Sequence, residues 1–332
     1  MQKILVTGAT GYIGSHTWVE LLNAGYEVIG VDNFINSRPV VLERIASITG
    51  RKLNFVEGDL CNPETSRAVF EQHDISSVIH FAALKAVGES VQKPLAYYAN
   101  NLNSLLTVCE NMGDADVERL VFSSSATVYG EPASVPITED FPLSATNPYG
   151  MTKLVGEQIL RDLELSDPSW KIAYLRYFNP VGAHESGLIG ENPLGTPNNL
   201  MPYIAQVANG RLEKLSIYGN DYPTPDGTGV RDYIHVVDLA KAHIAGLRYL
   251  ENESKSITAN IGTGVGYSVM EMVAEYARVS GREIPFDLVA RRSGDIAVCY
   301  ADPTLAKTEL KWQAEKSLQA MCEDSWRWQS NC

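Results

Sequence analysis

The 332-residue chain is 45% hydrophobic, enough for a large buried core in one domain or in two closely joined domains. Its formal charge of −13 argues against nucleic acid or an anionic membrane surface as the main partner. Five cysteines without a Cys-x-x-Cys pair argue against a disulfide framework or a zinc site and favour a reducing cytosol. No apolar run reaches the roughly 18 residues that span a bilayer, so we expect neither secretion nor membrane insertion.

The first half of the chain alternates short apolar runs with helical patterns. The apolar runs are rich in Ile, Leu, Val and Phe without polar alternation, which is typical of strands covered on both faces. Helices between successive strands predict a parallel, doubly wound sheet of the Rossmann type. The expected strands lie at 3–7, 27–32, 53–57, 77–81, 119–124 and 171–177, and the expected helices at 14–24, 39–49, 63–71, 95–112 and 149–165.

This alternation ends after Asn179, where residues 182–232 hold many Gly, Pro and Asn. We therefore predict an α/β protein with a Rossmann-type domain over 1–178 and a smaller, mixed α/β substrate domain over 179–332. Parts near 237–261 are candidates to pack back on the first domain, and ligand is expected in the cleft between the domains. Helical or strand patterns return at 199–209, 215–218, 237–250, 268–280, 303–310 and 317–328.

Gly8, Gly11 and Gly14 follow the first apolar strand and open the next helix. Glycine lets the backbone approach a phosphate without an intervening side chain. A helix N-terminus adds free N–H groups and a partial positive charge. In this context the spacing predicts a site for the pyrophosphate of a dinucleotide; the alternative is a glycine-rich turn of an ordinary α/β protein.

Acids and small residues follow the next strands. Asp32 ends the second strand, where an acid accepts hydrogen bonds from the adenosine ribose and repels a 2′-phosphate, which favours NAD over NADP. Asp59 ends the third strand and is a candidate adenine contact, although an Asx turn or a cap suits it equally. Phe81 and Ala82 follow the fourth strand, where they either let a cofactor lie close to the sheet or simply pack.

Tyr149 and Lys153 are four residues apart and share one face of a helix that Pro148 can start. A tyrosine has a pKa of about 10, which must fall by roughly three units before the phenol acts as a base. A lysine ammonium and the positive nicotinamide of NAD⁺ both have the required sign. Taken alone, a tyrosine and a lysine at this spacing usually lie on a solvent-exposed helix face. After the fifth strand of a dinucleotide fold it predicts hydride chemistry at a hydroxylated carbon, with a serine from 123–125 bonding the reacting hydroxyl.

Several longer sequence segments identify a family more specifically than the glycine motif does. They occupy 7–16, 81–90, 123–130, 147–150, 175–183, 197–202, 218–223 and 226–235, the last reading Asp226-Gly-Thr-Gly-Val-Arg-Asp-Tyr-Ile-His235. Through them the chain resembles the extended short-chain dehydrogenase/reductase family over essentially its full length. Within that family the strings are similar to those of the UDP-glucose 4-epimerases.

The resemblance implies an isomerase of galactose metabolism that interconverts UDP-glucose and UDP-galactose with NAD. Tyr149 would take the O4 proton while C4 gives hydride to NAD⁺, and Ser125 would orient or relay the proton. Lys153 would hold the nicotinamide ribose and lower the pKa of the tyrosine. The 4-keto sugar would turn over while UDP stays held, so that the returning hydride inverts C4 and leaves NAD regenerated and tightly bound.

The resemblance also implies two sets of binding residues, a homodimer formed through the helices near 95–112 and 149–165, and a cytoplasmic location. Arg231 and Arg292 would supply the local cations that a protein of charge −13 needs to hold a diphosphate. The residues implied around NAD are Gly8, Gly11, Tyr12, Ile13, Gly14, Asp32, Asn33, Asn36, Ser37, Asp59, Leu60, Phe81, Ala82, Lys85, Asn100, Tyr149, Lys153 and Phe178. Those implied around the UDP-sugar are Ser125, Tyr149, Asn179, Asn199, Leu200, Tyr218, Arg231, Arg292, Asp295 and Cys299.

A few positions bear on which related activities the chain could have. Cys299 stands where other members carry a bulky tyrosine, so the sugar end is expected to admit N-acetylated UDP-sugars, unless Cys299 merely fills the core. A dehydratase or decarboxylase needs an acid where this chain has Ala126 and Thr127. A 4-epimerase for pentose or N-acetylhexosamine nucleotides stays open. A non-catalytic NAD-binding protein is expected to lack the Tyr149 and Lys153 pair, and no residue spacing suggests a metal site.

Overall fold

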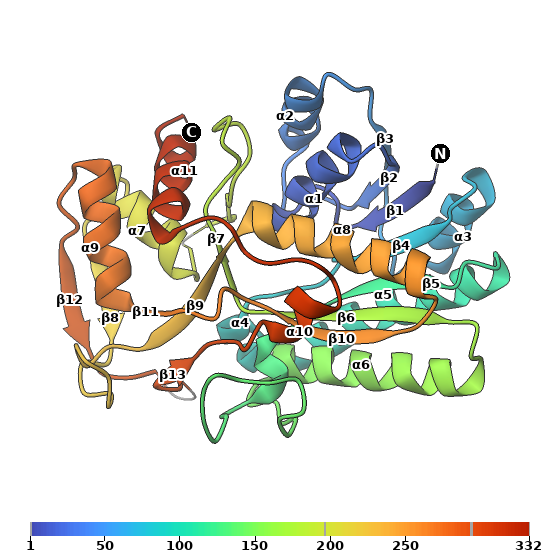
Figure 1. Cartoon of the computed structure of the whole chain (residues 1–332). Coiled ribbons are helices and arrows are strands. Elements are labelled where there is room, and N and C mark those ends of the chain that lie inside the picture. The colour runs from blue at the N-terminus through green and yellow to red at the C-terminus, as the bar shows by residue number, and fades with distance from the viewer. Residues whose placement is uncertain (1, 196, 293–294, 332) are drawn as a thin grey trace.

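The computed structural model describes residues 2–195, 197–292 and 295–331, which form a large parallel sheet and a smaller mixed lobe (Figure 1). The large sheet has seven strands in the order β10-β6-β5-β4-β1-β2-β3, and each pairing is parallel. The Rossmann-type, doubly wound sheet predicted from the sequence is confirmed. Its strands are β1 (Lys3–Thr7), β2 (Glu27–Asp32), β3 (Asn54–Glu57), β4 (Ser77–His80), β5 (Arg119–Ser125), β6 (Lys171–Tyr177) and β10 (Ile257–Ile261).

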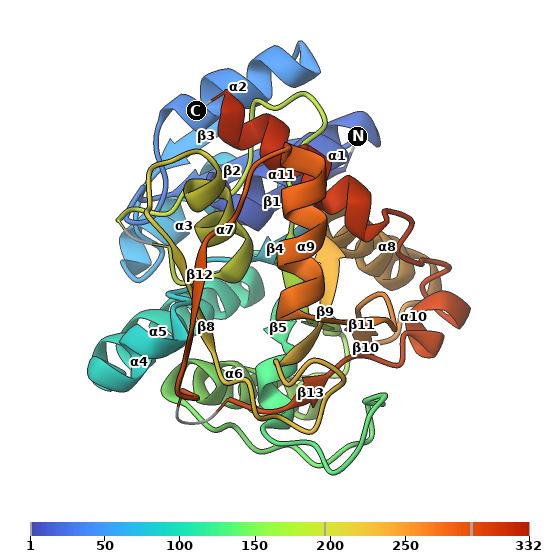
Figure 2. The ribbon, with the colours of Figure 1, turned by 90° about the vertical axis from the view of Figure 1, so that its left-hand side faces the viewer.

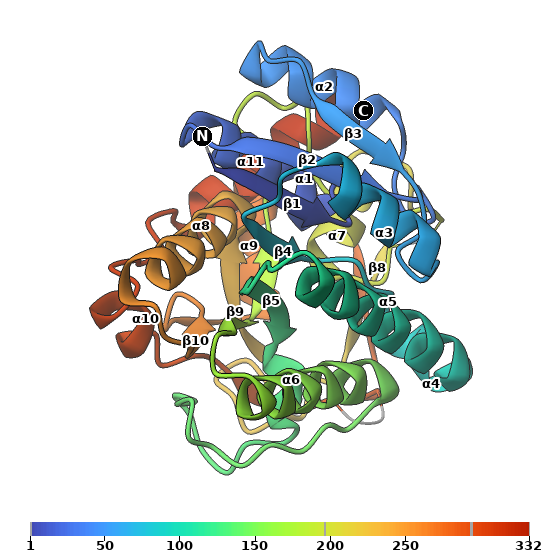
Figure 3. The same ribbon diagram turned by 90° about the vertical axis from the view of Figure 1, so that its right-hand side faces the viewer.

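Side-chain alternation along the strands divides the core between the two faces of this sheet. Ile4 and Val6 of β1 pack with Trp18 of α1 on one face, whereas Leu5 packs with Val69 and Leu105 on the other. Both faces of the sheet are therefore covered and excluded from water, which explains why the strand sequences lack polar alternation. One face carries α1 (Tyr12–Asn23), α2 (Val40–Thr49) and α8 (Val236–Glu253), and the other carries α3 (Pro63–Gln72), α5 (Pro94–Asp114) and α6 (Pro148–Ser166) (Figure 3).

The chain returns to the large sheet after leaving it. β10 pairs with β6, Ile261 opposite Tyr177, and α8 packs along α1. No strand was expected at 257–261, because a five-residue run with Thr and Asn among its apolar residues gives little periodic signal. With β10 in place, β6 is an interior strand, and its last residues are held on both sides.

The smaller lobe lies at the carboxyl end of β6, because β7 (Asn179–Val181) begins only two residues after β6 ends. β7 pairs with β9 (Val230–His235), which also pairs with β11 (Gly266–Ser268) and β13 (Val298–Cys299), so this sheet mixes parallel and antiparallel strands. The lobe thus stands over the strand ends where ligands of such sheets bind. Its other elements are β8 (Leu215–Tyr218) paired with β12 (Phe286–Val289), and the helices α7 (Leu200–Ala208), α9 (Val269–Ser280) and α11 (Leu318–Ser330), which pack together (Figure 2). Short elements are α4 (Val87–Gln92), η1 (Ala126–Tyr129) and α10 (Thr304–Thr308).

Candidate active site

The glycine turn joins the end of β1 to the start of α1. Gly8 has a φ of +63°, in the left-handed region that glycine adopts without strain, and the Gly11 amide donates to the Gly8 carbonyl at 3.1 Å. A Cβ on Gly14 would lie 2.2 Å from that carbonyl oxygen, and a Cβ on Gly8 would lie 3.0 Å from the Ala82 nitrogen. The free N–H groups at the start of α1 therefore lie against the carboxyl end of the sheet, which fits the pyrophosphate of a dinucleotide.

Replacing Gly14 by alanine is expected to lower the NAD content of the purified protein about tenfold. The added methyl group must displace the Gly8 carbonyl, and overpacking of this kind costs about 1–3 kcal/mol. NAD released on denaturation, per chain, is the measurement. Gly88→Ala is the matched control, because a Cβ on Gly88 meets nothing within 4 Å. A folded Gly14→Ala protein with full NAD content would contradict this prediction.

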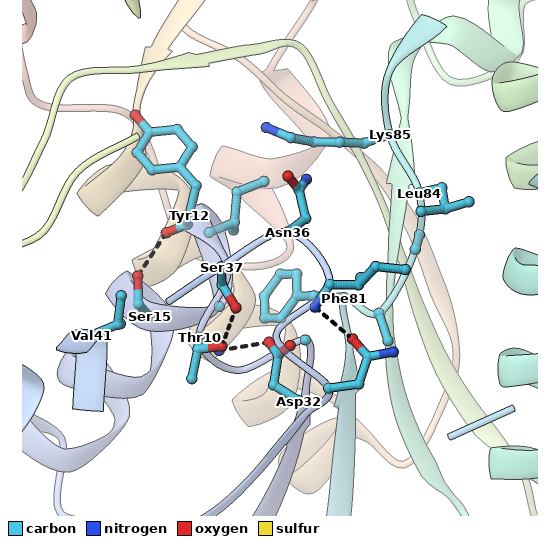
Figure 4. A pocket seen from close by; sticks show the side chains of 18 of the residues that line it. Thr10, Tyr12, Ser15, Asp32, Asn36, Ser37, Val41, Phe81, Leu84 and Lys85 are labelled. Atoms are coloured by element: carbon cyan, nitrogen blue, oxygen red, sulfur yellow. Dashed lines mark hydrogen bonds between the residues drawn. The ribbon is translucent and has the colours of Figure 1, made fainter. Parts of the chain in front are cut away.

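A pocket opens at the carboxyl ends of β1, β2 and β4, beside the glycine turn (Figure 4). It brings together almost all of the residues predicted around NAD. Phe178 is not among its lining residues and packs instead with Val128 and Tyr129, because successive residues of an extended chain point to opposite faces and Tyr177 takes the pocket side. The predicted residues that line the pocket are Gly8, Gly11, Tyr12, Ile13, Gly14, Asp32, Asn33, Asn36, Ser37, Asp59, Leu60, Phe81, Ala82, Lys85, Asn100, Tyr149 and Lys153.

Asp32 lies at the end of the pocket where the adenosine ribose is expected. One of its carboxylate oxygens accepts from the Thr10 amide at 3.0 Å (Figure 4), and the other accepts from the Phe34 amide at 2.9 Å. A carboxylate oxygen can accept more than one hydrogen bond, so these contacts orient Asp32 and leave acceptor positions for a ribose. The turn-forming and ribose-binding interpretations of Asp32 are therefore compatible.

Tyr149 and Lys153 lie in the first turns of α6, buried and on one face. The helix begins as predicted with Pro148, and the side chain of Asn147 caps it by accepting from the Gly150 amide at 2.9 Å. Lys153 Nζ donates to the Ser123 carbonyl at 2.7 Å, and burial lowers its pKa to about 8. Burial also raises the pKa of Tyr149, so in the protein alone this phenol is protonated. The lowered pKa that a base requires therefore stays a prediction for the protein with its cofactor bound.

The three serines that end β5 have three different partners. Ser124 Oγ donates to Glu157 at 2.6 Å, away from the pocket, and Ser123 Oγ donates to the Tyr177 hydroxyl at 3.0 Å. Ser125 is the serine that interacts with the Tyr149 phenol, lowering the pKa of that phenol against the larger effect of burial, and its Oγ accepts from the Thr127 hydroxyl at 3.0 Å. The sequence alone left open which serine meets the base; the pleat of β5 turns Ser124 to the opposite face, and Ser123 is already bonded to Tyr177.

Among the pocket residues that were absent from the predicted set, two carry polar groups that bear on the site. Tyr177 ends β6 opposite Ser125 and lines the pocket beside Tyr149. Glu191 also lines the pocket, and one of its carboxylate oxygens accepts from Lys85 Nζ at 2.9 Å and from the Asn199 side-chain amide at 2.7 Å. Glu191 thereby links a predicted cofactor residue to a predicted substrate residue. Only its position, in an irregular Gly- and Pro-rich segment, could have suggested a ligand-facing loop.

Tyr149 lines this pocket and Ser125 ends β5, whereas the other residues predicted around the UDP-sugar lie outside this pocket, in two groups. Asn179, Arg231 and Cys299 occupy the adjoining strands β7, β9 and β13, with Cys299 directly opposite Arg231. Asn199 and Leu200 lie at the start of α7, where Leu200 packs on the lobe's core.

The second group lies beside β8. Arg292 lies over the Tyr218 ring, 4.6 Å from its centroid, and its Nε is 2.9 Å from an Asp295 oxygen. Residues 293 and 294, between this arginine and its acid, are not described. Over the described part of the chain no cluster of His, Cys, Asp or Glu could hold a metal ion.

The comparisons with known proteins cover the whole chain. Residues 5–325 match the family described as GDP-mannose 4,6 dehydratase. The UDP-glucose 4-epimerase of Bacillus subtilis is 60% identical, over 99% of this chain and 97% of its own length. That of Drosophila melanogaster is 56% identical, over 98% and 96%. The chain belongs to the UDP-glucose 4-epimerase family. The crystal structure of the Bifidobacterium longum UDP-glucose 4-epimerase in complex with NAD⁺ and UDP superposes with a TM-score of 0.96 at 53% identity, covering 99% of this chain and 98% of that one.

The two residues before Val128 fit an epimerase better than a dehydratase. The matching family model takes its description from a dehydratase, and a dehydratase needs acid–base groups for elimination. In η1 those places are held by Ala126 and Thr127, and the Thr127 hydroxyl is used in a 3.0 Å hydrogen bond to Ser125. The dehydratase alternative therefore lacks its catalytic groups.

Proposed function

We propose that this protein interconverts UDP-glucose and UDP-galactose by inverting C4 of the sugar, with NAD as a bound cofactor. The observation that carries the proposal is the burial of Tyr149 and Lys153 on one face of α6, where both line the dinucleotide pocket. The Bacillus and Drosophila relatives carry this activity in their names, and the Bifidobacterium structure holds NAD⁺ and UDP. We propose the residues named above for the two ligands, with galactose metabolism as the setting.

The reaction requires one base, one path for hydride and a sugar free to turn. Bound NAD would supply the hydride acceptor and then the hydride donor for C4. Tyr149 takes the O4 proton as the alcohol becomes a ketone, and returns it when the ketone is reduced. Ser125 orients O4 at the phenol, and Lys153 adds positive charge where the phenolate forms. Arg231 and Arg292 hold the diphosphate, so the 4-keto sugar turns over without leaving.

The assay that tests this function uses purified protein, UDP-galactose and no added nicotinamide cofactor. We expect NMR of the products to show UDP-glucose approaching equilibrium with UDP-galactose. UDP-xylose in a parallel reaction tests the pentose alternative. Denatured protein that releases NAD while the native protein leaves UDP-galactose unchanged would favour a non-catalytic NAD-binding protein.

Turnover of UDP-GlcNAc and UDP-GalNAc is the expected consequence of Cys299. Its side chain is half-buried, packs beside Val128 and Phe178, and lies opposite Arg231. Replacing Cys299 with tyrosine fills the sugar end, so we expect at least about a tenfold loss of N-acetylated turnover with UDP-galactose turnover kept within about threefold. Product NMR for both substrate pairs is the measurement. Wild-type protein that fails to interconvert the N-acetylated pair contradicts the prediction.

We further propose a cytoplasmic homodimer formed through α5 and α6. Leu95 and Leu106, 82% and 41% exposed, are eleven residues apart on α5 and so share one face. Leu165 near the end of α6 is 82% exposed, and α5 and α6 pack side by side. The described cysteines are free thiols, as a reducing compartment favours. Over the described residues, no helix has the length and apolarity to cross a membrane. Light scattering after gel filtration tests the dimer.

A further inference from the structure

A carboxylate of the smaller lobe lines the dinucleotide pocket. Glu191 belongs to residues 189–193, all of which line this pocket together with the glycine turn of the other lobe. One Glu191 oxygen accepts from Lys85 Nζ at 2.9 Å, and Lys85 follows β4 of the parallel sheet. This ion pair therefore joins the two lobes at the pocket itself. The proposed reaction gives Glu191 no role.

The backbone around Glu191 is fixed to its own lobe by Trp328 of α11. Trp328 Nε1 donates to the Glu191 carbonyl at 3.2 Å, and a Cβ on Gly190 would lie 2.5 Å from Cδ1 of that indole. Close packing and a hydrogen bond thus hold residues 189–193 against α11. The Glu191 side chain reaches Lys85 from this fixed backbone, so the ion pair resists separation of the two lobes.

Glu191 also has a partner on the substrate side. The oxygen that meets Lys85 accepts from the Asn199 side-chain amide at 2.7 Å, and the Glu191 side chain is only 10% exposed. An amide nitrogen carries two N–H groups and an ammonium carries three, so each donor can hold Glu191 and still donate to a ligand oxygen. Lys85 is proposed at NAD and Asn199 at the UDP-sugar. The two ligands would thus meet donors that share one acceptor.

We propose that Glu191 is a positioning residue that holds residues 189–193 closed over the bound dinucleotide, and that a UDP-sugar at Asn199 strengthens this hold. The inference rests on the function proposed above. The segment lines the pocket, so the dinucleotide leaves more readily when the segment moves away from Lys85 and breaks the ion pair. The pair must break for entry as well, so it slows exchange of NAD more than it changes the affinity. A ligand oxygen on the second N–H of Asn199 orders the amide that holds Glu191.

The test is the rate at which holoenzyme exchanges its NAD for labelled NAD, followed by the label retained after gel filtration. We expect Glu191→Ala, which loses both partners, to exchange about tenfold faster than wild type, and the isosteric Glu191→Gln about threefold faster. The Lys85 side chain is 41% exposed, so solvent screens the pair and keeps the effect moderate. The NAD content of the purified variants should match wild type.

The same exchange measured with UDP tests the link through Asn199. We expect UDP to slow exchange at least about threefold in wild type and less than about twofold in Glu191→Ala. Equal slowing in the two proteins would show that UDP acts by another route, and it overturns the part of the proposal that concerns the UDP-sugar.

Two controls separate the ion pair from a general loss of packing. Asp287→Ala removes a half-exposed carboxylate that pairs with Lys214 on the smaller lobe and does not line the pocket, so its exchange rate should match wild type. In a Lys85→Met background, Glu191→Ala should change the rate less than about threefold, because the cationic partner is already gone.

Three outcomes overturn the role of Glu191. One is a folded Glu191→Ala holoenzyme that exchanges NAD within about twofold of wild type. Another is an acceleration that persists undiminished in the Lys85→Met background. If Glu191→Ala does not fold, a Glu191→Gln holoenzyme no faster than wild type is the third. Wild-type holoenzyme that leaves UDP-galactose unchanged overturns the proposed function alone, since the exchange is measured without turnover.

Discussion

Replacing Tyr149 by phenylalanine is expected to lower kcat for UDP-galactose by about 10²- to 10⁴-fold, the range that a positioned proton-transfer group contributes. The phenol is buried, contacts Ser125, and shares its helix face with Lys153. In the variant a phenyl ring fills the same space, so we expect folding and NAD content to be unchanged. Only the group that accepts the O4 proton is lost.

Steady-state kinetics and NAD released on denaturation together decide this prediction. KM should stay within about threefold, because the phenol acts in the transition state more than in binding. Tyr174→Phe serves as the control, since the Tyr174 hydroxyl donates to Glu164 at 2.6 Å and Tyr174 does not line the pocket. A Tyr149→Phe enzyme that retains a tenth or more of wild-type turnover rules out this phenol as the base.

Replacing Arg176 by leucine is expected to cost about 3–5 kcal/mol of the free energy of unfolding. The guanidinium is 2% exposed and donates to both oxygens of Glu157, at 2.9 and 2.6 Å, and to the Tyr129 hydroxyl at 3.0 Å. Burial alone lowers the pKa of Arg176, but the bonds to Glu157 outweigh burial and raise that pKa, so the guanidinium is charged. Removing the cation leaves a buried carboxylate whose remaining cationic partner, Arg161, is 3.4 Å away and half-exposed.

Urea unfolding of the holoenzyme measures this loss. Lys93→Ala breaks the exposed pair of Lys93 with Glu89 on the surface and is expected to cost less than about 1 kcal/mol, which makes it the matched control. The double replacement of Glu157 and Arg176 by leucine should cost less than Arg176→Leu alone, because no charge is left without a partner. An Arg176→Leu protein within about 1 kcal/mol of wild type contradicts the prediction.

The same ion pair explains why α6 lies where catalysis needs it. Tyr149, Lys153 and Glu157 follow one another at intervals of four residues, so they form one face of the helix. Glu157 fixes that face to Arg176 of β6 and to Ser124 of β5. The proposed base and its lysine are thereby held against the ends of both strands.

The sequence by itself determined the elements whose signal is local. Apolar runs between helical patterns predicted the first six strands of the parallel sheet, and Gly8, Gly11 and Gly14 predicted the turn that lines the pocket. The interval from Tyr149 to Lys153 predicted that both lie on one helix face. In each case the signal comes from the spacing of a few neighbouring residues, so the local geometry of a helix or strand is enough to predict the element.

Only the tertiary structure decided what depends on segments far apart in the chain. It placed β10 beside β6, gave the three consecutive serines of β5 different partners, and brought Tyr177 into the pocket that Tyr149 lines. It also set Glu191 between Lys85 and Asn199. These contacts follow from strand register and from the packing of the second lobe on the first. Both arise from the burial of apolar surface across the whole fold, which cannot be predicted from a short segment of the sequence.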